Sequence, residues 1–126
     1  MTRFDHTNLG IENEYPKLVR DRIPEIIKEK TGRDAKQKVL IDDEEFLDAL
    51  LAKIIEEAVE LNHSKEADNL EEELADIFEI IDAILKLKGK TTKDIAAIQE
   101  EKRRKRGGFE KRILMLERAS REPLGH

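Results

Sequence analysis

Two stretches of the chain repeat apolar residues at helical spacing, and this pattern constrains the fold more than any other feature. At about 100° per residue, each stretch gathers its apolar side chains in one arc. The arc in residues 42–62 contains Phe46, Leu47, Leu50, Ile54, Ala58 and Leu61. The broader arc in residues 69–88 contains Leu70, Leu74, Ile77, Phe78, Ile80, Ile81, Ile84 and Leu85. The polar run NHSKEADN separates them, so we predict two amphipathic helices that form an antiparallel hairpin.

Capping signals predict where these helices begin and end. Asp42 and Glu45 have the D-x-x-E spacing of a helix start, and this helix is expected to run to about Asn62. Asp68 and Glu71 repeat the spacing for the next helix. Gly89 at a C′ position closes it.

A shorter helix is expected on each side of the hairpin. In YPKLVRDRIPEIIKEKTG, Asp21 is placed to cap a helix with Pro24 in its first turn and Gly32 at its end. After the hairpin, Thr91 or Thr92 caps a helix that reaches Arg106, where two glycines end it. A short apolar turn over residues 113–116 is expected to pack on a neighbouring segment.

The composition predicts an all-α fold of about four to five helices. The chain has 126 residues, which suits one domain. Its 42% charged and 4% aromatic residues are typical of helices with wide solvated faces, or of a helical protomer that completes its core with a partner. We expect an arm over residues 1–14, the domain over 15–118 and a tail over 119–126.

Charge and composition narrow the classes of function. The formal net charge of −5 does not favour a general nucleic-acid binder. The absence of cysteine excludes disulfides and thiolate sites and is compatible with a reducing cytoplasm. No apolar run approaches the roughly 18 residues of a membrane span, and no signal peptide follows Met1. We therefore expect a cytoplasmic protein without a membrane partner.

Four carboxylates lie where a helix would bury apolar side chains. Glu57 falls in the middle of the first arc and Glu60 at its edge, while Glu73 lies within the second arc and Asp76 at its margin. Folding the hairpin about its loop sets Glu57 level with Asp76, and Glu60 level with Glu73. The four carboxylates are therefore predicted to converge.

Such a cluster needs neutralisation by protons, basic side chains or a metal, because a buried unpaired carboxylate costs several kcal/mol. An all-oxygen set suits Mg²⁺ or Mn²⁺. Glu56 flanks the cluster and is placed to orient a water molecule. One rival interpretation is a solvated acidic face. Another is a di-iron site, which would require His63 as a ligand.

Two basic segments accompany the acids. The first segment, KLVRDRIP, contains Lys17, Arg20 and Arg22. The second, EEKRRKRGGFEKR, supplies a cluster that includes Lys102 and Arg106. Carboxylate-held metal beside such cations is the usual arrangement for binding a polyphosphate. Phe109 either stacks on a base or covers the core.

The motif E-E-x-x-E followed by E-x-x-D, at Glu56 to Glu60 and Glu73 to Asp76, resembles the signature of the all-α nucleoside triphosphate pyrophosphohydrolases. This superfamily includes MazG-type enzymes. The flanking KLVRDRIPEII and KRGGFEKRI are similar to its phosphoribosyl-ATP pyrophosphohydrolase-like branch. The resemblance covers about residues 17–116.

The resemblance implies Mg²⁺ held by Glu57, Glu60, Glu73 and Asp76, with Glu56 as a helper. We hypothesise that Glu56 or one of the ligand carboxylates accepts the proton of the attacking water. The resemblance further implies cleavage between the α- and β-phosphates to give a nucleoside monophosphate and pyrophosphate. It also implies a homo-oligomer, either a dimer or a tetramer. Two alternatives stay open: a non-catalytic helical dimerisation module, and a metal-dependent phosphohydrolase acting on another substrate.

Overall fold

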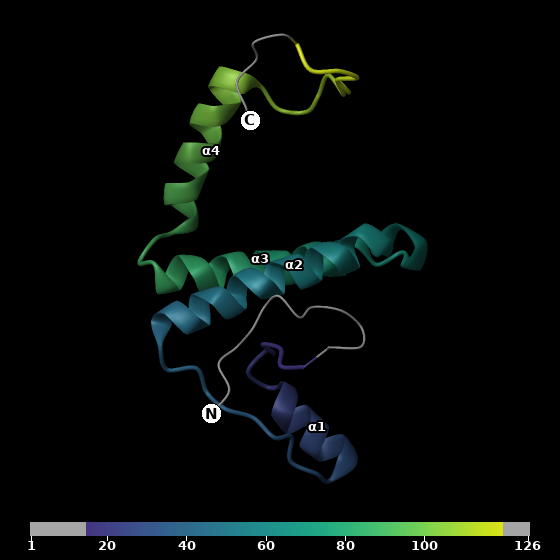
Figure 1. Ribbon diagram of the computed structural model, residues 1–126, viewed down its shortest axis with the longest axis vertical. Coiled ribbons are helices and arrows are strands. Elements are labelled where there is room, and N and C mark those ends of the chain that lie inside the picture. Colours follow the sequence, from purple (N-terminus) through teal and green to yellow (C-terminus); the bar gives the residue numbers. More distant parts are fainter. Residues whose placement is uncertain (1–14, 120–126) are drawn as a thin grey trace. The chain divides into compact units, whose positions relative to one another are not determined.

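The computed structural model describes residues 15–119 and confirms the all-α prediction. Four helices and no strand occur in that range (Figure 1). They are α1 (Ile23–Thr31), α2 (Asp43–Ala67), α3 (Leu70–Leu87) and α4 (Thr92–Arg106). The predicted arm and all but the first residue of the predicted tail lie outside the described residues.

Helices α2 and α3 pack against each other as the predicted hairpin (Figure 1). The core is small, and the buried apolar residues in the described range are Ala49, Leu50, Ala52, Ile80 and Leu85. Asp42 caps α2 as predicted, because its Oδ1 accepts the backbone N–H groups of Glu44 at 2.8 Å and Glu45 at 3.4 Å.

The loop of the hairpin is shorter than expected. Helix α2 continues to Ala67 instead of ending near Asn62. Polar residues do not interrupt a helix whose side chains face water, and the one buried residue there, Ser64, donates its hydroxyl to the Leu61 carbonyl at 2.6 Å. Asp68 has a φ of 57° and is the C-cap of α2, so it does not cap α3 as predicted. Asn69 holds that position instead.

Helix α1 has the predicted Pro24 in its first turn and ends at Gly32, whose φ of 72° suits glycine. Its predicted cap is wrong, since the N-cap is Arg22, with no side-chain cap bond. A cap at Asp21 would need the N–H of residue 23 or 24. The Ile23 N–H already donates to the Arg20 carbonyl at 3.0 Å, and Pro24 has none.

The chain divides into two compact units, residues 1–92 and 93–126, and each is described by itself. As predicted, α4 ends at Arg106 in the second unit and is followed by Gly107, whose φ is 82°. Arg103 forms an ion pair with Glu110. The apolar residues 113–116 are not helical and are exposed by 59–89%. Among residues 15–119, no helix combines the length and apolar character that crossing a membrane requires.

Candidate functional site

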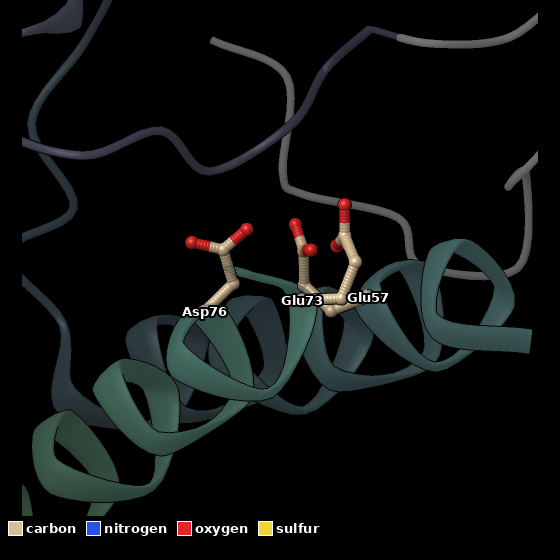
Figure 2. Close-up of side chains that lie close together, drawn as sticks. All are labelled: Glu57, Glu73 and Asp76. Atoms are coloured by element: carbon tan, nitrogen blue, oxygen red, sulfur yellow. The ribbon is translucent and has the colours of Figure 1, made fainter. Parts of the chain in front are cut away.

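Three carboxylates gather on the hairpin at Glu57, Glu73 and Asp76 (Figure 2). One oxygen of each lies within 4.8 Å of the others. Helix α2 supplies Glu57 and α3 supplies the other two, which are neighbours because they are three residues apart on a helix. We call this group the carboxylate cluster. Its three side chains point to the same side of the hairpin in Figure 2.

The structure places the fourth predicted carboxylate, Glu60, outside this group. Glu60 is exposed, since it lies at the edge of the α2 arc, whereas Glu57 lies in its middle. The predicted level of Glu57 with Asp76 is compatible with the cluster, in which one oxygen of Glu57 lies within 4.8 Å of oxygens of both Glu73 and Asp76. A metal-ligand role for Glu60 stays a prediction.

Burial is the main influence on the Glu57 carboxyl group, whose side chain is 13% exposed. Desolvation raises the pKa of Glu57 from its ordinary 4.5 to about 7, and the hydrogen bond with Glu73 acts in the same direction. The positive charge of Lys53 opposes this rise, and the negative charge of Asp76 adds to it. Near neutral pH, the cluster therefore retains a proton or requires another cation.

Lys53 is the internal cation of the site. Its Nζ lies 3.2 Å from Glu56 Oε1 and 3.7 Å from Glu57 Oε1, and its side chain is only 18% exposed. The sequence interpretation did not include Lys53. Its spacing of three and four residues from Glu56 and Glu57 was the available signal, because residues so spaced are neighbours on a helix.

A second residue that the sequence interpretation missed, Asn69, contacts Glu73. The Asn69 Nδ2 donates to Glu73 Oε1 at 3.1 Å. The other oxygen, Glu73 Oε2, is buried, and no hydrogen-bond donor among residues 15–119 reaches it. A proton on Glu57 would supply the hydrogen bond between the two carboxyl groups; a cation would satisfy the same oxygen. The cluster thus fits a hard divalent cation on the chemistry of its oxygens and on the unpartnered Glu73 Oε2.

The three predicted phosphate-binding residues of the first basic segment each contact a different partner. Arg20 reaches the cluster, with Nη2 2.7 Å from Asp76 Oδ1. Arg22 pairs with Glu25 at 3.5 Å, and the Lys17 ammonium lies 5.0 Å from the centre of the Tyr15 ring. Of these contacts, that of Arg20 is with the carboxylate cluster.

The remaining predicted residues belong to the second unit or to the exposed face of α2. Lys102, Arg106 and Phe109 belong to the second unit, where they are exposed, Phe109 by 96%. His63 is exposed on α2 and not in a loop, and it is outside the carboxylate cluster. A di-iron site with a His63 ligand therefore gains no support from the described residues.

Comparisons of the chain with models of known protein families, with curated proteins and with solved structures find no match. The fold and site define a class only in structural terms: an all-α protein whose helical hairpin carries a carboxylate cluster.

Proposed function

We propose that this protein is a Mg²⁺-dependent nucleotide pyrophosphohydrolase that cleaves between the α- and β-phosphates, releasing a nucleoside monophosphate and pyrophosphate. The observation that carries this proposal is the carboxylate cluster, which gathers three carboxylates from two helices and includes a buried Glu73 oxygen that has no hydrogen-bond partner among the described residues. The proposed class is that of the all-α nucleoside triphosphate pyrophosphohydrolases, in the phosphoribosyl-ATP pyrophosphohydrolase-like branch. Either an aberrant nucleoside triphosphate or a phosphoribosyl-ATP-like compound would be its substrate.

Glu57, Glu73 and Asp76 would hold the metal, with Glu60 as a further proposed ligand and Mn²⁺ as an alternative ion. When bound, Mg²⁺ supplies a Lewis acid that polarises the phosphoryl oxygens and lowers the pKa of a bound water. The protein's part is to fix the carboxylates: Asn69 holds Glu73 by a hydrogen bond, and Lys53 lies beside Glu57.

Other residues are proposed to accept the proton of the attacking water and to neutralise the phosphate charges. Glu56 adjoins the cluster through Lys53, at 3.2 Å, and is the proposed acceptor of the proton lost by the attacking water. Lys17, Arg20 and Arg22 of the first unit are proposed to bind the phosphates and stabilise the departing pyrophosphate. Lys102 and Arg106 are proposed for the same task, and Phe109 for stacking on the base.

We also propose a cytoplasmic homo-oligomer, a dimer or a tetramer, with a nucleotide and not a nucleic acid as ligand. Each helix of the hairpin exposes an apolar stripe at four-residue spacing, and these stripes support self-association. We call them together the exposed stripes; they are 39–65% exposed and consist of Leu51, Ile55 and Val59 on α2 and Leu70, Leu74 and Phe78 on α3.

The same exposed stripes favour the second candidate function, a non-catalytic dimerisation module. In that case the carboxylates would have no chemical role, and metal ions would not stabilise the fold. A phosphohydrolase acting on a non-nucleotide substrate is the other alternative, and analysis of reaction products separates it from the proposed enzyme.

The test is incubation of the protein with ribo- and deoxynucleoside triphosphates and phosphoribosyl-ATP, in Mg²⁺ or in EDTA, with products resolved by phosphorus NMR. We expect pyrophosphate and a monophosphate in Mg²⁺ only. Glu57→Gln should abolish this turnover while the protein stays folded, and Glu66→Gln, a change of an exposed residue on the same helix, should not. Equal rates for Glu57→Gln and the unsubstituted protein would contradict the proposal.

A further inference from the structure

We propose that Arg20 is an exchangeable counter-ion of the site: its guanidinium pairs with Asp76 until a divalent cation takes over that carboxylate, and then binds a phosphate group of the ligand. This inference rests on the proposed function, since it concerns the metal and phosphate that the site is proposed to bind. It assigns to Arg20 a role in metal affinity in addition to phosphate binding.

The contact between Arg20 and Asp76 joins residues 56 positions apart in the sequence. Arg20 Nη2 lies 2.7 Å from Asp76 Oδ1, within the range of a charge-assisted hydrogen bond. Arg20 belongs to the segment before α1, and its carbonyl accepts the Ile23 N–H at 3.0 Å, which fixes its backbone at the start of that helix. The side chain therefore reaches the cluster from an anchored backbone position.

Water reaches this ion pair. The Arg20 side chain is 56% exposed and that of Asp76 is 38% exposed. Ion pairs of such exposure contribute little to stability, because solvent screens their attraction. Breaking the pair thus costs little, and the guanidinium is free to change partner by rotating its own side chain.

Lys53 provides the contrast within the same site. It lies near two carboxylates, at 3.2 and 3.7 Å, and its side chain is 18% exposed. A half-buried ammonium with two acidic neighbours is held more firmly than an exposed guanidinium with one. The site therefore combines a retained cation on α2 with an exchangeable cation from the segment before α1.

Arg20 and a divalent cation compete because both neutralise Asp76, which belongs to the carboxylate cluster. Two positive groups at one carboxylate also repel each other, so the binding of either weakens the other. A displaced guanidinium would remain beside the cluster, where the phosphates of the proposed substrate bind. Its planar set of N–H donors matches a phosphate better than an ammonium does.

The test is isothermal titration of three folded proteins with MgCl₂ or MnCl₂: the unsubstituted chain, Arg20→Gln and Lys28→Gln. Lys28→Gln is the matched control, since it removes one positive charge from another exposed ion pair, with Asp34 at 3.0 Å, outside the cluster. We expect Arg20→Gln to bind the metal about two- to fivefold more tightly, which corresponds to the loss of one exposed ion pair. The control should bind it as the unsubstituted protein does.

A second titration, of the metal-loaded proteins with inorganic pyrophosphate, tests whether the displaced Arg20 guanidinium binds a phosphate group. Arg20→Gln should bind pyrophosphate about tenfold more weakly, because it lacks a charge-assisted hydrogen bond. Far-UV circular dichroism and thermal melting verify that each variant is folded.

Several results would overturn the inference. Metal affinity that is unchanged or weaker in Arg20→Gln would exclude competition at Asp76, and equal tightening in both variants would show a general effect of charge. Unchanged pyrophosphate affinity would exclude the transfer to phosphate. If the unsubstituted protein binds neither metal, the proposed function fails and the inference fails with it. If it binds metal but Arg20→Gln gives one of the results above, the inference alone fails.

Discussion

Among the described residues, Glu57 has the largest pKa shift. Burial and a hydrogen bond with Glu73 raise its pKa to about 7, although Lys53 lies 3.7 Å away. The protonated form is therefore favoured by folding, and ionisation at neutral pH costs stability. The pH dependence of stability therefore reports on this single carboxyl group.

In EDTA, the free energy of unfolding should fall as the pH rises from 4.5 to about 7. Between these values the folded protein binds more protons than the unfolded chain, so the stabilisation is complete below pH 4.5 and lost above pH 7. After allowance for solvent screening, the loss is on the order of 2 kcal/mol. Urea unfolding across this range measures it.

Glu57→Gln provides the control for that titration, since the amide has no proton to lose. In this variant the pH dependence should be flatter, and the stability above pH 7 should be higher than that of the unsubstituted protein. A slope that persists unchanged in Glu57→Gln would mean that another group titrates.

At the scale of a helix, local hydrogen bonds decide where each element begins. Asp42 accepts two backbone N–H groups at the start of α2, whereas Asp21 does not cap α1. The two aspartates resemble each other in sequence context, because each precedes an apolar helical repeat. Asp42 caps a helix and Asp21 does not, because only Asp42 has free backbone N–H groups two and three residues later to accept.

We predict that Asp42→Ala lowers the free energy of unfolding by about 1 kcal/mol, the usual cost of losing a helix cap. Asp21→Ala should change it by less than about 0.5 kcal/mol, as is usual for exposed surface positions. Urea unfolding at pH 7 compares the variants, and Asp42→Asn, which retains a capping oxygen, should recover most of the loss. Similar losses for both alanine variants would contradict this account of the caps.

At the scale of the whole molecule, binding of a ligand to the folded state must raise its stability. We predict that Mg²⁺ or Mn²⁺ raises the melting midpoint by several degrees at a concentration well above the dissociation constant. Glu73→Gln should abolish this increase, because Glu73 carries the unpartnered buried oxygen. Glu71→Gln, which changes an exposed residue of the same helix, should preserve it.

The exposed stripes lead to a prediction about assembly. If a second copy covers them, light scattering after gel filtration should give a mass above 14.6 kDa, the mass of one chain. Phe78→Glu should lower that mass, because Phe78 is 65% exposed in the single chain and a charge there could not be buried at low cost. Glu79→Gln, at the adjacent exposed position, should leave the mass unchanged. A monomeric unsubstituted protein would contradict the proposed oligomer.

Local information was sufficient for much of this architecture. Apolar periodicity predicted both long helices, and the polar run between them predicted the hairpin, because these signals act within a few residues. The same periodicity predicted that Glu57, Glu73 and Asp76 would meet, since helical geometry sets their faces and the hairpin sets their levels. The helix ends were predicted less well. Asp68 adopts a left-handed conformation, which its neighbours in the sequence do not predict.

The composition of the site depended on tertiary structure. Packing of α2 on α3 decided that the Glu57 side chain is only 13% exposed and lies in the cluster with Glu73, whereas Glu60, one turn away, faces water. It also determined which oxygen of Glu73 has no partner. The contact of Arg20 with Asp76 joins distant parts of the chain. Burial, and pairing over such a separation, depend on how elements pack in space, and local spacing in a sequence does not contain that information.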